Sequence, residues 1–120
     1  MRVVVFGGCG FLGCWLIKKL LDNNLNVVVF DKEINKNFLK RIVNFSSKEI
    51  DFIKGDITKY NQVFSAAQRG KILINLAGLM TPDCSENPVA GNAVNVIGSI
   101  NVFEAAKKQN NKFVIYTSSG

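Results

Sequence analysis

The fold of this chain is decided by residues 3–13, which read VVVFGGCGFLG. The apolar run at the start has no polar alternation, which predicts a strand buried on both faces, as in a parallel sheet. A cluster of glycines follows at once, and the residues after it repeat with the spacing of a helix. Such a strand, turn and helix bring backbone N–H groups at the helix N-terminus against a phosphate. The stretch therefore predicts a dinucleotide-binding turn.

Two glycine spacings overlap in this turn. Gly8, Gly10 and Gly13 form G-x-G-x-x-G, and Gly7 begins the related spacing G-x-x-G-x-x-G. The spacing alone is a weak signal, but its context matches the motif, because Asp31 ends the next predicted strand about 20 residues later. The alternative is a glycine turn that only tightens the packing of helix on strand. We expect the cofactor contacts of the turn to come from Gly7, Gly8, Cys9, Gly10, Phe11, Leu12 and Gly13.

The composition limits the class of protein. The chain has 120 residues, 48% of them apolar, which suits one globular domain. Three cysteines predict reduced thiols rather than a disulfide framework. Because Met1 and Arg2 lead straight into the first strand, we expect no signal peptide and a cytoplasmic protein. The absence of histidine excludes histidine-based metal sites and Ser-His-Asp chemistry within these residues, and we predict no metal site.

The net charge of +6 comes from scattered basic residues. The chain contains no long basic run, and its basic residues are not interleaved with stacking aromatic residues as in nucleic-acid grooves. No apolar run reaches the length of a membrane span. We therefore expect a solvated surface that attracts anionic ligands, with neither a nucleic acid nor a membrane as partner.

Hydrophobic periodicity predicts strands that alternate with helices, which is typical of a parallel, doubly wound α/β sheet. Strands are expected at residues 2–6, 26–30, 50–54, 71–75 and 112–117. Helices are expected at residues 12–23, 35–44, 59–67 and 88–109. In the last helix, the face expected to lie on the sheet consists of Val89, Ala93, Val96, Ile97, Ile100 and Phe103. Another side, which favours a second packing partner, carries Val94, Gly98, Val102 and Ala105.

The glycine turn, Gly7-Gly8-Cys9-Gly10-Phe11-Leu12-Gly13, resembles the opening T-G-G-x-G-F-[IL]-G of the extended short-chain dehydrogenase/reductases. This family includes NAD-dependent sugar-nucleotide epimerases and dehydratases. Phe6 stands where the family usually has Thr. The resemblance covers the whole chain but only the N-terminal part of the family pattern. It implies a Rossmann-type sheet with strand order 3-2-1-4-5, truncated after the fifth strand, beside which a sixth normally lies.

Asp56 and Ile57 follow the third strand and match the family's strand-end pair that contacts adenine. In the family the carboxylate takes the exocyclic amine of the base, and the backbone after it reads the ring edge. The alternative is that Asp56 or Thr58 caps the next helix, and the two interpretations are compatible.

The fourth strand and the last helix carry two further matches. Asn75 begins a segment that fits the family's [NH]-x-A-[AG], which passes close to the cofactor; the residues implied there are Leu76, Ala77 and Gly78. Asn95 matches the Asn of the family's N-V-x-G-[TS] run, which lies near the active centre. The alternative for Asn95 is a polar helix residue that fills space.

The chain ends in a segment where the resemblance places a catalytic serine. Its hydroxyl hydrogen-bonds the substrate oxygen, and we favour Ser119 with Ser118 second; the alternative is a serine-rich loop. The family continues with a Tyr-x-x-x-Lys pair, but neither Tyr60 nor Tyr116 has a lysine four residues on. We therefore expect residues 1–120 to be an incomplete NAD(P)-binding domain that lacks the C-terminal strands and the substrate domain.

Asp31 favours NAD over NADP, because a carboxylate there accepts the hydroxyls of the adenosine ribose and repels a 2′-phosphate. Lys32, also a cofactor-binding candidate, tempers that preference. We expect the NAD(H)-binding portion of an oxidoreductase, epimerase or dehydratase. The expected substrate is a small molecule, a nucleotide sugar, that reacts at a hydroxyl or carbonyl group. The alternative is a non-catalytic NAD-binding sensor or scaffold module. We also expect a homo-oligomer, formed through the strand at 113–116 or through the helix at 88–109, which pairs with its mate in the family.

Overall fold

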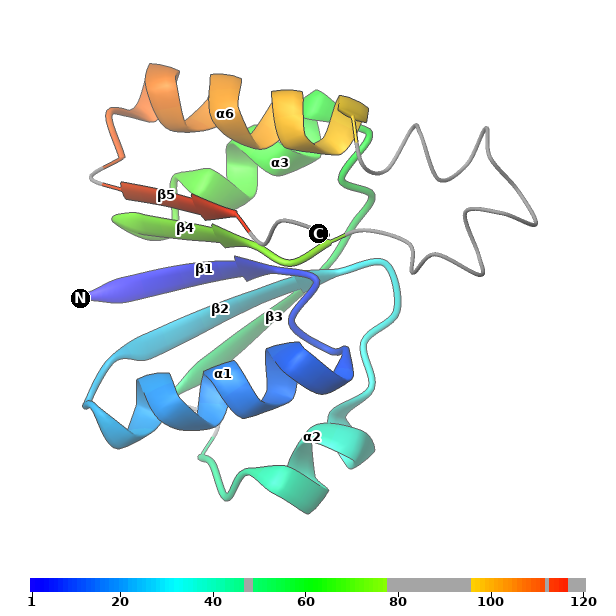
Figure 1. Ribbon diagram of the computed structural model, residues 1–120, viewed down its shortest axis with the longest axis vertical. Coiled ribbons are helices and arrows are strands. Elements are labelled where there is room, and N and C mark those ends of the chain that lie inside the picture. The colour runs from blue at the N-terminus through cyan, green and yellow to red at the C-terminus, as the bar shows by residue number, and fades with distance from the viewer. Residues whose placement is uncertain (47–48, 78–95, 112, 117–120) are drawn as a thin grey trace.

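The computed structural model describes residues 1–46, 49–77, 96–111 and 113–116. These residues form a parallel sheet between two layers of helices (Figure 1). The strands are β1 (Arg2–Phe6), β2 (Asn26–Asp31), β3 (Ile50–Lys54), β4 (Ile72–Asn75) and β5 (Phe113–Tyr116). The helices are α1 (Phe11–Asp22), α2 (Lys36–Ile42), α3 (Tyr60–Ala67) and α6 (Gly98–Gln109).

The strand order is β3-β2-β1-β4-β5, as the resemblance implied. Every neighbouring pair is parallel, and β1 lies between β2 and β4, with Val3 opposite Val27 on one side and Ile72 on the other. The side chains of residues 3–6 and 27–30 are at most 2% exposed, which explains why both runs are apolar without alternation. The carboxyl ends of all strands therefore meet at one edge of the sheet.

Each face of the sheet has its own hydrophobic core. Helices α1 and α2 cover one face, where Val3, Val5 and Ile17 are buried. Helices α3 and α6 cover the other face (Figure 1). There Val4 and Phe6 belong to one buried cluster with apolar side chains of both helices. The tilted ring contact of Phe6 with Phe30, 5.1 Å between centroids, joins β1 to β2.

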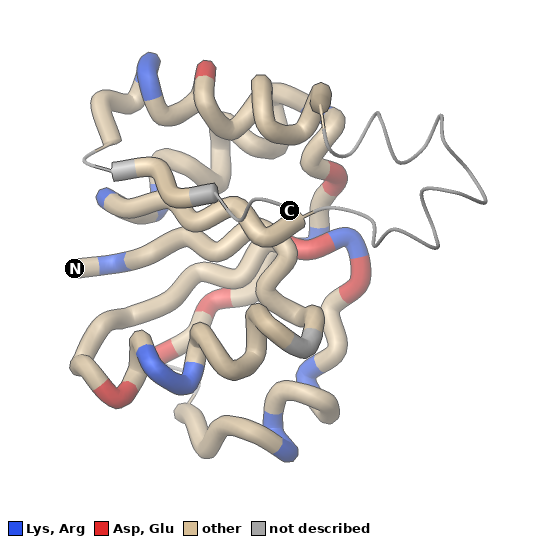
Figure 2. Tube along the Cα trace, viewed as in Figure 1, with Lys and Arg blue, Asp and Glu red and all other residues tan. Residues whose placement is uncertain are grey.

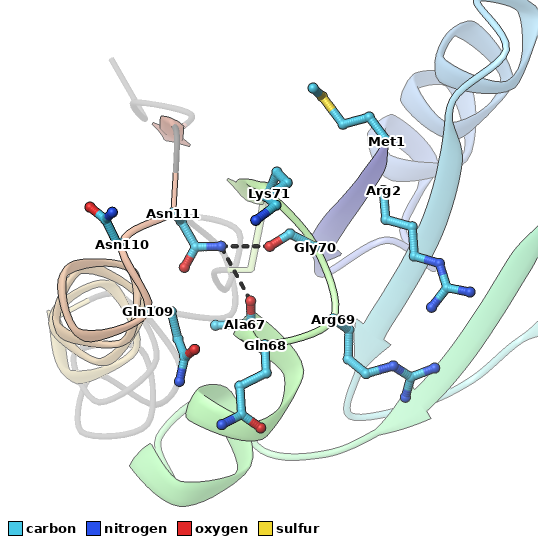
Figure 3. Close-up of a pocket in the computed structure, with 10 residues that line it drawn as sticks. All are labelled: Met1, Arg2, Ala67, Gln68, Arg69, Gly70, Lys71, Gln109, Asn110 and Asn111. Atoms are coloured by element: carbon cyan, nitrogen blue, oxygen red, sulfur yellow. Dashed lines mark hydrogen bonds between the residues drawn. The ribbon is translucent and has the colours of Figure 1, made fainter.

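Two amides from α6 and the turn after it hold the two ends of α3. Asn101 Nδ2 donates to the carbonyl of Ile57, 2.9 Å away, ahead of α3. Asn111 Nδ2 donates to the carbonyls of Ala67 and Gly70, at 3.2 and 2.6 Å, behind α3 (Figure 3). These bonds fix α3 along its length against α6.

Charged residues are scattered along the described chain, with both signs present near the carboxyl edge of the sheet (Figure 2). Arg2 and Arg69 both pair with Asp51, at 3.6 and 2.9 Å. In the part of the chain that the structure describes, no helix has the length and apolar character needed to cross a bilayer.

The predicted element boundaries differ from the observed ones by one or two residues in the described parts of the chain. The shifts occur at element ends, where Asn35 and Lys59 are the residues just before α2 and α3 rather than their first turns. Residues 88–95 of the last predicted helix, and Lys112 and Thr117 of the last predicted strand, lie outside the described residues.

The predicted sheet-facing side of the last helix is wrong. Val96, Ile97, Ile100 and Phe103 are exposed, whereas the buried residues of α6 are Gly98, Asn101, Val102, Ala105 and Ala106. The physical reason is close approach: a Cβ on Gly98 would lie 2.9 Å from the Ile57 side chain. Small residues face the protein because α6 packs too closely for large ones.

The observed buried side of α6 can be tested by making the same Val→Ala substitution at a buried and at an exposed position. We expect Val102→Ala to lower the free energy of unfolding by about 1–3 kcal/mol, because it empties a filled site in the core. Val96→Ala removes the same atoms from a residue that is 55% exposed and should change stability by no more than about 0.5 kcal/mol. Urea unfolding measures both, and equal losses would contradict this placement of α6.

Candidate functional site

The turn between β1 and α1 is fixed by contacts between backbones. Gly7 has a φ of 85°, and its N–H donates to the carbonyl of Phe30 at 2.7 Å. A Cβ on Gly7 would lie 2.7 Å from the backbone nitrogen of Ala77, and one on Gly13 would lie 2.6 Å from the carbonyl oxygen of Gly8. Side chains at these two positions are therefore excluded by the protein itself.

Gly10 differs from those glycines because nothing in the described protein crowds it. The nearest atom to a Cβ built there is 3.8 Å away, and its backbone is extended, with φ −76° and ψ 174°. Gly10 is exposed and precedes α1, whose N-terminus receives no side-chain cap from any described residue. The positive end of the α1 dipole thus faces outward beside a residue without a side chain, an arrangement that fits a phosphate group.

Asp31 lies beside this turn, as predicted. It ends β2 half-buried, and the N–H of Cys9 donates to its Oδ2 at 2.9 Å. The bond joins two sequence-predicted site residues that are 22 positions apart. It orients the carboxylate at the carboxyl edge of the sheet, next to the glycine turn.

The loop after β3 brings Asp56 and Ile57 to the same edge. Asp56 Oδ1 accepts hydrogen bonds from the Thr58 hydroxyl at 2.7 Å and from the Thr58 N–H at 2.9 Å. These bonds lower the pKa of Asp56, and the positive charges of Lys59 and Lys32 act in the same direction. Neither Asp56 nor Thr58 caps α3: the residue before the helix is Lys59, and the Asp56 bonds close a turn instead.

The end of β4 completes the described part of the site. Asn75 is buried and its Oδ1 accepts the N–H of Ala77 at 3.0 Å, while the N–H of Leu76 donates to the carbonyl of Phe6 at 2.8 Å. Ala77 is the residue against which Gly7 packs. The ends of β1 and β4 are therefore held in backbone contact.

Two buried thiols lie in the turn and the first helix. Burial is the main cause that raises the pKa of Cys9, and it raises the pKa of Cys14 to about 11. Both thiols are therefore neutral at physiological pH and are poor nucleophiles. Of the remaining predicted residues, Leu12 is exposed and Lys32 is exposed, and Phe11 begins α1.

Four predicted site residues lie outside the described part of the chain: Gly78, Asn95, Ser118 and Ser119. One residue close to the site was missed by sequence reasoning, namely Asn101, which bonds Ile57. The sequence feature that could have indicated Asn101 is its position one turn after Gly98, where a polar amide recurs among small residues.

A surface hollow lies at the opposite, amino-terminal edge of the sheet (Figure 3). It is lined by the start of β1, the turn after α3 and the turn after α6. Its two guanidinium groups, from Arg2 and Arg69, are both paired with Asp51. The Asn111 amide donates to the carbonyls of Ala67 and Gly70, which also line it. None of the residues predicted to bind the cofactor lines it.

Comparison with known proteins agrees with this geometry. The chain spans about a third of the length of the curated relatives it matches. Human 3 beta-hydroxysteroid dehydrogenase type 7 is 32% identical over 119 residues, covering 97% of this chain and 32% of that protein. A putative UDP-glucose 4-epimerase of Methanocaldococcus jannaschii is 28% identical over 120 residues, covering 98% and 38%.

Solved structures show the same fold. The Thermus thermophilus UDP-glucose 4-epimerase in complex with NAD superposes with a TM-score of 0.84 at 27% identity, covering 99% of this chain and 38% of that one. The sequence profile of the 3-beta hydroxysteroid dehydrogenase/isomerase family matches residues 4–120. This chain therefore belongs to the 3-beta hydroxysteroid dehydrogenase/isomerase family, within the extended short-chain dehydrogenase/reductases, and corresponds to the N-terminal part of its relatives.

Proposed function

We propose that residues 1–120 are the NAD(H)-binding domain of a longer oxidoreductase or epimerase. The observation that carries the proposal is Gly10, an exposed glycine that no described atom requires to be glycine, next to the uncapped N-terminus of α1. A pyrophosphate accounts for both features, because it needs N–H donors and a close approach of the backbone. The Thermus thermophilus epimerase, which carries NAD, supports this choice of ligand.

Asp31 would hold the adenosine ribose. The Cys9 N–H engages Oδ2 of its carboxylate and so orients the group, and a carboxylate at the end of β2 favours two free ribose hydroxyls over a 2′-phosphate. Lys32, next in the chain and exposed, offers a positive charge that reduces this preference without reversing it. We therefore assign NAD as the cofactor in preference to NADP.

The remaining assignments follow the order of the strands. Asp56 and Ile57 would contact the adenine, and Leu76, Ala77, Gly78 and Asn95 would lie toward the nicotinamide. When bound, the nicotinamide supplies hydride transfer. Ser119, with Ser118 second, would hydrogen-bond the substrate oxygen.

The substrate is proposed to be a hydroxyl or carbonyl compound. Relatives named for nucleotide sugars, such as the UDP-glucose 4-epimerases, support a nucleotide sugar as the substrate. Relatives named as hydroxysteroid dehydrogenases make a steroid the other candidate substrate. A non-catalytic NAD-binding module is the second candidate, because the fold alone does not fix the function. Turnover of a nucleotide sugar by the gene's full-length product would exclude that second candidate.

The exposed apolar side of α6 is proposed as a self-association surface. Ile97, Ile100 and Phe103 are 46%, 55% and 62% exposed and recur at a spacing of three, so they share one side of the helix. The opposite side packs against α3 and the sheet. A helix that is apolar on two sides favours a second partner, and a second copy of the chain is the partner we assign.

The glycine turn gives a matched pair of variants. We expect Gly10→Ala to keep the fold, because its methyl group would clash with no described atom, and to weaken NAD binding by about tenfold or more through loss of close phosphate approach. Gly13→Ala should instead destabilise the protein, since its methyl group would meet the Gly8 backbone. Calorimetry with NAD and thermal unfolding measure the two effects. Undiminished NAD binding by a folded Gly10→Ala protein would overturn the phosphate assignment.

The Asp31 assignment is tested by the ratio of NADP to NAD dissociation constants. We expect NAD to bind about tenfold or more tightly than NADP, and Asp31→Asn to reduce the ratio, because it removes the charge that repels the 2′-phosphate. Asp22→Asn, at the far end of α1, makes the same change in net charge and should leave the ratio unaltered. Equal affinity of the wild-type protein for both dinucleotides would refute the assignment.

Self-association is tested by molar mass. We expect light scattering to give the mass of a dimer for the wild-type protein and of a monomer for Ile100→Glu, because the carboxylate cannot be buried in an apolar contact without a partner. Asn37→Glu introduces the same charge at an exposed residue of α2, on the other face of the sheet, and should remain dimeric. A wild-type protein that stays monomeric at high concentration would rule out this surface.

A further inference from the structure

The buried side of α6 carries one side-chain amide in direct contact with the candidate site. Asn101 is 9% exposed and lies among the small residues of that side. Its Nδ2 donates to the backbone carbonyl of Ile57 at 2.9 Å, a bond between residues 44 positions apart. A buried amide is retained in an apolar contact only when it is hydrogen-bonded, and here the bond reaches the loop at the carboxyl end of β3.

Gly98, one turn earlier on α6, acts on the same residue. A Cβ there would lie 2.9 Å from Cγ2 of Ile57, so the Ile57 side chain occupies the space that the missing Gly98 side chain leaves. Ile57 is 6% exposed as a result. Helix α6 therefore contacts both the side chain and the carbonyl of Ile57. Together these two contacts fix the position of the Ile57 backbone relative to the helix.

The rest of this loop is held by shorter-range bonds. The Asp56 N–H donates to Oε1 of Gln62 at 2.8 Å, and the Asp56 carboxylate is tied to Thr58. Gln62 is exposed, and both of these contacts lie within the loop and α3. They shape the loop but do not set its position relative to α6. Asn101 supplies the hydrogen bond of that link, beside the packing contact between Gly98 and the Ile57 side chain.

We propose that Asn101 is a positioning residue for adenine recognition: its bond to the Ile57 carbonyl holds Asp56 and the Ile57 backbone where they read the edge of the base. This inference rests on the proposed NAD site. It adds a residue of α6, outside the strand-end loops, to the determinants of base specificity. Asn101 acts through Ile57 and needs no contact with the ligand.

The test compares NAD with nicotinamide hypoxanthine dinucleotide, which differs only in the base. Its hypoxanthine replaces the exocyclic amine by a carbonyl and protonates the neighbouring ring nitrogen, so a site that reads adenine binds it more weakly. We expect Asn101→Leu to reduce the preference for NAD by about fivefold or more. This is the change in the ratio of dissociation constants that corresponds to the loss of about one hydrogen bond. A general loss of stability would weaken both ligands alike and leave the preference unchanged.

Asn111 provides the matched control. Its amide makes the same kind of bond to backbone carbonyls, but at the opposite end of α3. Asn111→Leu is therefore expected to lower the free energy of unfolding while preserving the preference for NAD. Loss of the preference in Asn111→Leu as well would show that any loosening of α3 suffices and would overturn the specific role of Asn101.

A second variant keeps the test decisive if Asn101→Leu does not fold. Asn101→Asp restores a donor to Ile57 only when its carboxyl group is protonated. Its preference for NAD is expected to rise as the pH falls from 7.5 to 5, relative to the wild-type protein at each pH. An unchanged preference in folded Asn101 variants overturns this inference, whereas a wild-type protein that binds neither dinucleotide overturns the proposed function.

Discussion

Backbone contact between the β1–α1 turn and the segment after β4 is the constraint on which the site depends. Gly7 and Ala77 approach so closely that no side chain fits at Gly7, and Gly8 and Gly13 close the other side of the turn. With these positions filled by backbone, the N-terminus of α1 is directed outward at the carboxyl edge of the sheet. The close backbone packing at Gly7, Gly8 and Gly13 therefore leaves Gly10 exposed at the N-terminus of α1.

The same edge gathers residues that are distant in sequence because the sheet is parallel. All strands end at this edge, so Asp31 and Asn75, the last residues of β2 and β4, and Asp56, just after β3, border one region. Each of these side chains accepts a hydrogen bond from a backbone N–H, that of Cys9 for Asp31, Thr58 for Asp56 and Ala77 for Asn75. These bonds orient polar groups without requiring the burial of unpaired charge.

Sequence reasoning predicted what local patterns determine. The apolar run of β1, the glycine spacing and Asp31 are all local signals, and the structure places them together. The buried side of α6 was not predictable in this way, because Ile100 and Val102 are both apolar and periodicity does not distinguish them. The close approach of α6 to Ile57 determines which side of the helix is buried, and this approach is set by the tertiary structure. Asn101 was missed for the same reason, since its partner lies 44 residues away.

The central position of β1 has a consequence for how the chain folds during synthesis. Val3 pairs with Val27 on one side and with Ile72 on the other, so β1 receives its second neighbour only when a strand that lies much later in the chain has been synthesised. Until then, one edge of a strand whose residues 3–6 are all apolar has no partner from its own chain. Pairings of this sequence separation form slowly, and unpaired apolar edges favour aggregation. The nascent chain is therefore expected to depend on chaperones until β4 has left the ribosome.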